Sequence, residues 1–182
     1  MPMKDSKPGN QLVNLVKETL GILVVAFILS MVLKTFVVEA RVIPTGSMLP
    51  TIQENDRVLV NKFIYRFHPP QRYDIIVFEP PLETGFNEDF IKRVIGLPGE
   101  KVEIKNGQVM INGQPLKEDY IQEKPNYHFG PVTVPPNSYF VMGDNRNRSF
   151  DSHLWNGWLT IDHIKGKAFY TYWPPGRMGN LE

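Results

Sequence analysis

The chain has 182 residues, and its 20 lysines and arginines nearly balance its 19 aspartates and glutamates, giving a formal net charge of +1. A charged fraction of 21% suits one folded domain with an appendage better than wholesale disorder. No dense basic patch interleaved with aromatic residues stands out, so we expect no nucleic-acid partner. The absence of cysteine excludes disulfides, thiolate nucleophiles and cysteine metal sites.

The first element expected from the sequence is a membrane-spanning helix. From Leu20 to Val38 the chain is apolar except at Ser30, Lys34 and Thr35. In an α-helix this length rises about 28 Å, close to the thickness of the hydrocarbon core of a bilayer. A cleavable signal peptide and a buried helix of a soluble domain are the competing interpretations, and residues 38–40 resemble a small-residue cleavage site.

Basic residues flank this segment unevenly. Lys4, Lys7 and Lys17 precede it, whereas Lys34 and Arg41 follow its apolar core. The excess of lysine and arginine that is usual on the cytoplasmic side of a membrane therefore favours a cytoplasmic N-terminus. We expect a cytoplasmic segment at 1–18, a single-pass anchor in the cell membrane at 19–38, and a domain on the outer face at 39–182.

Short strand-like runs recur after residue 40, and they alternate or are rich in β-branched residues. They are Arg57–Val60, Asp74–Phe78, Lys101–Ile104, Gln108–Ile111 and Tyr139–Met142. Asn106-Gly107 separates the third run from the fourth, a spacing typical of a β-hairpin. No helix-length amphipathic pattern follows the anchor. We therefore expect a mostly β fold: an antiparallel sheet body with a small irregular β subdomain at about 99–138, preceded by one N-terminal transmembrane helix.

A candidate nucleophile follows the apolar segment, in the sequence Pro44-Thr45-Gly46-Ser47-Met48-Leu49-Pro50-Thr51. A serine hydroxyl is a poor nucleophile near neutral pH, so acyl transfer needs a base to take its proton and donors to hold the oxyanion. Gly46 would let backbone amides approach that oxyanion. Taken alone, however, the motif is more typical of a turn.

A candidate base is Lys92, which lies among the apolar residues Phe90, Ile91, Val94 and Ile95. Burial there would disfavour the charged ammonium and leave a neutral amine that can accept a proton. Lowering a lysine pKa from about 10.4 to between about 7 and 8 is worth roughly 4 kcal/mol, so the fold must supply real burial. The alternative is a solvated lysine on a half-buried strand.

A polar cluster from Met142 to His153 is entered directly from an apolar strand. Such a cluster can shape a site. It can also be a hydrogen-bonded loop in which Asp144 and Asp151 only cap turns.

Together the three segments resemble bacterial type I signal peptidases, the serine-lysine proteases that remove signal peptides from exported preproteins. The resemblance rests on the N-terminal span and on three boxes in the expected order. These are Ser-Met-x-Pro-Thr at Ser47, Lys-Arg-Val-x-Gly-x-Pro-Gly at Lys92, and Gly-Asp-Asn-Arg-x-x-Ser-x-Asp-Ser at Gly143.

The resemblance implies a role for each matching residue. Ser47 would be the nucleophile and Lys92 the general base. Thr45 Oγ and the Ser47 amide would form the oxyanion hole, and Ser149 would orient the Lys92 amine. Structural support would come from a further set of polar residues: Arg93, Asp144 and Asp151.

Two departures from the family pattern bear on Asp151. His153 stands where the family commonly has arginine. Asn156 looks like one residue more than the family pattern has before the glycine that is here Gly157. The presence of His153 also permits a rival catalytic triad of Ser47, His153 and Asp151. The other histidines, at 68, 128 and 163, are not at ligand spacing, so we expect no metal and no organic cofactor.

The substrate is expected to bind as an added strand beside Arg41–Pro44 and Asp89–Ile91, where main-chain hydrogen bonds hold it. The substrate-binding residues would be Ile43, Pro44, Phe90 and Ile91. The resemblance implies a preference for small residues before the cut, with preprotein signal peptides and the lipid bilayer as partners. Exposed tryptophans would sit in the membrane interface, the candidates being Trp155, Trp158 and Trp173, although at least one of them is expected to pack in the core instead.

Two other functions remain open from the sequence. A self-cleaving regulator of the serine-lysine type shares the chemistry, although such proteins carry a soluble N-terminus. A membrane-anchored β binding module would use Ser47 and Lys92 only as structural residues.

Overall fold

The structure is a computed structural model that describes residues 8–181. Lys4 and Lys7, on which the topology expectation partly rests, lie outside the described residues. The chain divides into two compact units, Met1–Val37 and Val38–Glu182.

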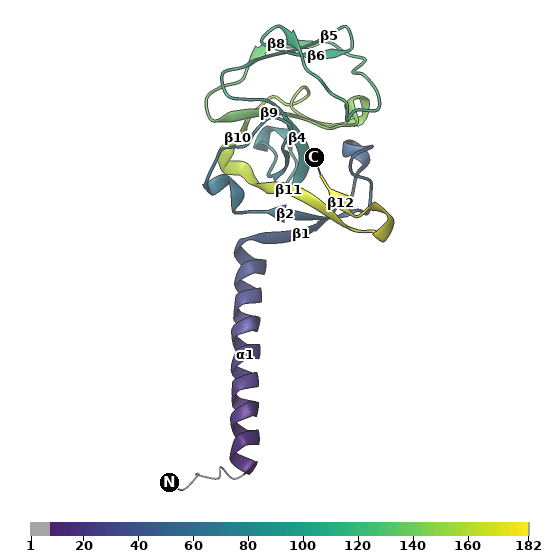
Figure 1. Cartoon of the computed structure of the whole chain (residues 1–182). Coiled ribbons are helices and arrows are strands. Elements are labelled where there is room, and N and C mark those ends of the chain that lie inside the picture. The colour runs from purple at the N-terminus through teal and green to yellow at the C-terminus, as the bar shows by residue number, and fades with distance from the viewer. Residues whose placement is uncertain (1–7, 182) are drawn as a thin grey trace. The chain divides into compact units, whose positions relative to one another are not determined.

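The described residues of the first unit contain one helix, α1 (Pro8–Phe36) (Figure 1). Its stretch Val13–Met31 is long and apolar enough to cross a membrane, and none of it is buried. The helix ends before the residue at which we expected the anchor to end, because Val38 pairs with Asn61 in a strand. Valine is favoured in strands, so the apolar composition of residues 37–38 was misleading.

The second unit is mostly β, and all of its strand pairs are antiparallel, which confirms the predicted fold class. The larger sheet has eight strands in the order β1-β2-β11-β3-β4-β9-β10, with β12 paired to β11. Its strands are β1 (Val38–Val42), β2 (Arg57–Asn61), β3 (Ile75–Phe78), β4 (Phe90–Gly96), β9 (Ser138–Met142), β10 (Leu159–Thr160), β11 (Ile164–Trp173) and β12 (Gly179–Asn180).

A second sheet has four strands in the order β7-β6-β5-β8, and β5, β6 and β8 lie together at the top of Figure 1. Its strands are β5 (Lys101–Lys105), β6 (Gln108–Ile111), β7 (Gln114–Pro115) and β8 (Phe129–Thr133). The predicted β5–β6 hairpin is present, and both of its turn residues, Asn106 and Gly107, have positive φ angles of 53° and 73°. That conformation explains the Asn-Gly sequence.

Six short 3-10 helices occur among the loops that the structure describes. They are η1 (Gly46–Met48), η2 (Ile64–Arg66), η3 (Leu82–Thr84), η4 (Arg146–Arg148), η5 (Ile161–His163) and η6 (Pro175–Arg177).

The centre of the larger sheet is buried on both faces. In β3, Ile75 and Val77 enter one apolar cluster, while Ile76 and Phe78 enter another. Successive strand residues point to opposite faces, so a strand covered on both sides needs a continuous apolar run. A third cluster joins β4 and β9 to the smaller sheet. The core therefore surrounds β4, the strand that carries Lys92.

The longest strand, β11, was not predicted from the sequence. It pairs with β2 on one side and with β3 on the other, and register shifts interrupt both pairings. The shifts break the regular alternation of apolar residues, and Gly166 is atypical of a strand. Gly166 is needed for close approach, because a Cβ there would lie 2.4 Å from the carbonyl oxygen of Asn61.

Trp155 is a tryptophan that packs in the core, as expected for at least one of the three. Its side chain is only 8% exposed and its ring packs against Phe78 and Phe90 in the core. Trp158 packs against the cluster between the sheets, whereas Trp173 is 49% exposed.

We predict that Gly166→Ala destabilises the protein by about 1–3 kcal/mol, because the added methyl group would displace the backbone of β2. Gly176→Ala is the matched control, since a Cβ there has nothing within 4 Å. It should change the free energy of unfolding by less than about 0.5 kcal/mol. Urea unfolding of the full chain in detergent, followed by tryptophan fluorescence, measures both. Equal stabilities would show that the β2–β11 approach tolerates a side chain.

Candidate active site

Ser47 and Lys92 meet in the structure although they lie on separate elements. Ser47 is in η1 and Lys92 is in the middle of β4. Lys92 Nζ lies 2.7 Å from Ser47 Oγ, across 45 residues of sequence. Both residues are nearly fully buried, with exposed fractions of 5% for Lys92 and 8% for Ser47. The fold thus places a hydroxyl and an amine at hydrogen-bonding distance inside the protein.

Packing and main-chain bonds hold the serine turn against the core. Met48 and Ile52 are fully buried in the apolar cluster beneath η1. The Leu49 N–H donates to the Gly46 carbonyl over 3.2 Å, and the Ile52 N–H donates to the Met48 carbonyl over 3.0 Å. The apolar residues in Ser-Met-Leu-Pro-Thr-Ile therefore fix where Ser47 points.

Burial lowers the pKa of Lys92 from 10.5 to about 8. Desolvation is the largest cause, and the negative charges of Asp151 and Asp144 partly oppose it. In the β3–β4 register Lys92 lies directly opposite Ile76, which has no exposed surface. A substantial fraction of the amine is therefore neutral near pH 8 and able to accept a proton.

Thr45 and Ser149, the other two hydroxyls expected at the site, differ in their contacts. Thr45 is exposed, and its Oγ1 donates to Ser47 Oγ over a long distance of 3.4 Å. Ser149 is buried, yet its Oγ has no hydrogen-bond partner among residues 8–181. The expected bond from Ser149 to Lys92 is thus not formed in this structure.

Gly143 provides the close approach that joins the polar cluster to the serine turn. A Cβ at this position would lie 2.4 Å from the Ser47 carbonyl oxygen and 2.3 Å from Ser149 Oγ. Only glycine fits between these two groups. At Gly46 a Cβ would come no closer than 3.0 Å to a neighbouring atom, and that atom belongs to a flexible leucine side chain.

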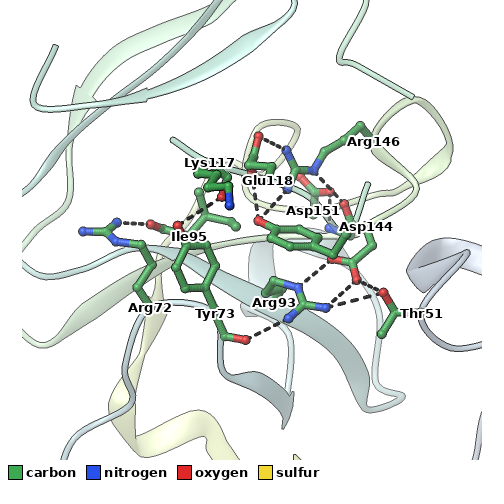
Figure 2. Close-up of polar contacts among 12 residues, drawn as sticks. Thr51, Arg72, Tyr73, Arg93, Ile95, Lys117, Glu118, Asp144, Arg146 and Asp151 are labelled. Atoms are coloured by element: carbon green, nitrogen blue, oxygen red, sulfur yellow. Dashed lines mark hydrogen bonds and ion pairs between the residues drawn. The ribbon is translucent and has the colours of Figure 1, made fainter. Parts of the chain in front are cut away.

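Arg93, the residue after Lys92, forms a fully buried ion pair with Asp144 (Figure 2). Arg93 Nε and Nη2 donate to the two Asp144 oxygens over 2.9 and 2.7 Å. Thr51 Oγ1 donates to Asp144 Oδ2 over 2.6 Å, and Arg93 Nη1 donates to the Tyr73 carbonyl over 3.0 Å. This network ties the end of the serine turn to β4 and to the loop after β9.

A second buried ion pair connects the same loop to residues 116–128, the segment between β7 and β8 that is called the excursion below (Figure 2). Arg146 donates to Glu118 over 2.8 Å and also to the Gly143 carbonyl over 3.0 Å. The Arg93 guanidinium lies 4.1 Å from the centroid of the Tyr120 ring, a favourable cation–π contact. The excursion thus packs against Arg93 and Arg146, the two buried arginines beside the site.

His153 is a partner of Asp151 and not of Ser47. Asp151 Oδ1 lies 2.6 Å from His153 Nδ1, while its other oxygen accepts the Gly143 N–H over 2.9 Å. The imidazole stacks on Tyr127 with the ring centroids 4.1 Å apart. Within residues 8–181, the side-chain partners of Ser47 Oγ are Lys92 and Thr45. The rival triad is therefore not assembled, and His153 is the partner of Asp151 in place of the arginine expected from the resemblance.

A cleft of about 490 Å³ opens over Ser47 and Lys92, the pair called the dyad below. Pro44, Phe90 and Ile91, three of the four expected substrate-binding residues, line it together with Ser47 and Lys92. The fourth, Ile43, lines an adjoining groove of about 430 Å³, which also contacts Pro44, Phe90 and Ile91. Aromatic side chains form part of the cleft wall: Phe86, Phe90 and Phe150.

The sequence reasoning missed two residues at this site, Gly143 and Asn145. Asn145 donates from its side chain to the Gly46 carbonyl and from its backbone to the Ser47 carbonyl. A glycine directly after an apolar strand and before a polar cluster was the available signal for close approach. Over the described part of the chain, no group of three or more histidines and carboxylates is placed to hold a metal ion.

Comparison with known proteins identifies similar chains over most of this length. A family model described as "Signal peptidase, peptidase S26" matches residues 16–173. "Signal peptidase I" of Leptolyngbya laminosa is 52% identical over 169 residues, covering 90% of this chain and 81% of that protein. "Probable signal peptidase I-1" of Synechocystis sp. is 50% identical over 171 residues, covering 91% and 87% respectively. "Signal peptidase I S" of Bacillus subtilis is 35% identical over 167 residues, covering 86% and 88%.

We predict that Asp144→Ala destabilises the protein by about 3–5 kcal/mol, because it leaves the Arg93 guanidinium buried without its counter-charge. The Lys117–Asp119 pair offers a contrast, since its side chains are 83% and 75% exposed. Asp119→Ala should cause no measurable change. Thermal unfolding in detergent compares the two variants. A small effect of Asp144→Ala would mean that water reaches Arg93.

Proposed function

This chain belongs to the signal peptidase family, peptidase S26, and from that premise we propose how its residues remove signal peptides from preproteins. The resemblance drawn from the three sequence boxes is confirmed, and the protein is a serine peptidase of the signal peptidase type. The sequence had also left a binding module and a self-cleaving regulator open, and its relatives favour neither.

We assign Ser47 as the nucleophile and Lys92 as the general base. One observation carries this assignment: Lys92 Nζ lies 2.7 Å from Ser47 Oγ, and burial brings the pKa of the amine down to about 8. A general base must be within hydrogen-bond reach of the proton that it takes, and its pKa must lie near the working pH. Lys92 meets both conditions.

The reaction then proceeds through an acyl-enzyme. The neutral Lys92 amine takes the proton of Ser47 as Oγ attacks the scissile carbonyl, and the Ser47 N–H and Thr45 Oγ1 donate to the oxyanion. The resulting ammonium gives its proton to the leaving amine. Water, deprotonated by the same amine, then releases the signal peptide and restores Ser47.

The substrate strand is proposed to lie between Arg41–Pro44 and Asp89–Ile91. β1 is the end strand of the larger sheet, so one of its edges is open to pairing with an extended peptide. The cleft and the adjoining groove line the same two segments. Shallow apolar surfaces at Ile43 and Ile91 would favour small residues before the cut.

The bilayer is proposed as the second partner. Helix α1 is long and apolar enough to span it, and the basic residues before the span favour a cytoplasmic N-terminus with the peptidase unit on the outer face. A signal peptide carries its own apolar segment in the same bilayer. Tethering both in one membrane raises the local concentration of cleavage sites around Ser47.

Wild-type protein in detergent should cut a preprotein after a small residue, and the folded variants Ser47→Ala and Lys92→Ala should be slower by at least about 10³-fold. Mass spectrometry of the products reads the position of the cut and the residue before it. Lys105→Ala is the control, because this lysine pairs with Glu103 at the surface, and it should cut normally. Cutting by folded Lys92→Ala at the wild-type rate would contradict the assignment of Lys92 as the general base.

The pH dependence follows from the lowered pKa of Lys92. Below pH 8 the amine is protonated and cannot act as a base, so kcat/KM should fall about tenfold per pH unit there and level off above pH 8. Rates on a short peptide substrate between pH 5.5 and about 10 test this. An inflection near 6.5, the ordinary histidine value, that disappears in His153→Gln would move the base to His153.

A further inference from the structure

We propose that Asn145 is a positioning residue that fixes the orientation of the oxyanion donor at Ser47. This inference rests on the function proposed above, in which the Ser47 N–H stabilises the tetrahedral intermediate. Asn145 acts on that donor from the opposite side of the same peptide group, and it takes no part in proton transfer.

The contacts of Asn145 bracket the peptide that joins Gly46 to Ser47. Its side-chain Nδ2 donates to the Gly46 carbonyl over 3.0 Å. Its backbone N–H donates to the Ser47 carbonyl over 3.1 Å. Asn145 is thus bonded to two successive carbonyls of the serine turn, one on each side of the nucleophile.

The geometry of a peptide group turns the first of these bonds into control of the oxyanion donor. The Gly46 carbonyl and the Ser47 N–H belong to one planar unit and point in opposite directions. A side chain that holds the carbonyl oxygen therefore sets the direction of the N–H. The same bond polarises the peptide and strengthens its N–H as a donor.

Asn145 is itself held firmly by its neighbours in sequence. Asp144 is locked in the buried ion pair with Arg93, and Arg146 donates to the Gly143 carbonyl and to Glu118. The residues before and after Asn145 are both essentially unexposed. A positioning residue must itself be held rigidly, because displacing a donor by about 1 Å can lower the rate about 100-fold.

Loss of the Asn145 amide should not leave an unsatisfied group. The Gly46 carbonyl also accepts the Leu49 N–H over 3.2 Å, so removing the side chain does not expose a bare buried acceptor. Asn145 is only half-buried and lines the cleft. The expected defect is therefore kinetic and not one of folding.

Asn145→Ala should lower kcat on a short peptide substrate by about 10–100-fold with little change in KM, since the oxyanion exists only in the transition state. A peptide aldehyde, which forms a tetrahedral adduct with Ser47, should bind more weakly by a similar factor. The pH profile of kcat/KM should keep its inflection, because the base is unaltered. A purely structural role would not give this combination.

Asn147→Ala is the matched control. Asn147 lies two residues further along the same loop and donates to Glu123 and to the Lys124 carbonyl, away from the dyad. It should leave kcat and aldehyde affinity unchanged. If Asn145→Ala does not fold, Asn145→Leu, which is close in shape but has neither the donor nor a charge, decides the question.

An unchanged kcat in a folded Asn145 variant overturns the inference. A rise in KM alone overturns it too, because it would make Asn145 a substrate contact, and so does a moved pH inflection, which would place its action on Lys92. Ser47→Ala separates these failures from failure of the proposed function: cutting by Ser47→Ala overturns both proposals. Loss of cutting in Ser47→Ala with full activity in Asn145→Ala overturns this one alone.

Discussion

The amine of Lys92 lies beside Ser47 in a position almost closed to water, and a positive charge there is costly. The drop in its pKa from 10.5 to about 8 corresponds to roughly 3 kcal/mol that disfavours the ammonium. That cost must be offset by packing, and the strand that carries Lys92 lies where three apolar clusters meet. The same burial that makes the amine a usable base therefore requires a sheet covered on both faces.

The carboxylates around the dyad pose the opposite problem, because negative charges raise the pKa of the amine. Asp151 and Asp144 both act on Lys92 in this direction. Each has its own partner: Arg93 binds Asp144 through two hydrogen bonds, and His153 binds Asp151. Both partners anchor the carboxylates, and the positive charge of Arg93 offsets part of the field of Asp144.

The loop after β9 connects the parts of the site. Gly143 packs on the Ser47 carbonyl, and the residues that follow it reach the serine turn, β4 and the excursion. Tyr120 and Tyr127, both from the excursion, stack on Arg93 and His153. The excursion thus positions Arg93 and His153, the two side chains that pair with the carboxylates.

The sequence by itself determined the apolar N-terminal helix, the mostly β fold, the β5–β6 hairpin and the three boxes, because composition, alternation and Asn-Gly turns are local properties of the chain. It did not determine β11, whose alternation is broken by register shifts, the burial of Trp155 or the partner of His153. The tertiary structure decided these, and it brought Lys92 to Ser47 across 45 residues and Asp144 to Thr51 across 93. The physical reason is that burial and the choice of a polar partner depend on which distant segments pack together, and local patterns do not encode that.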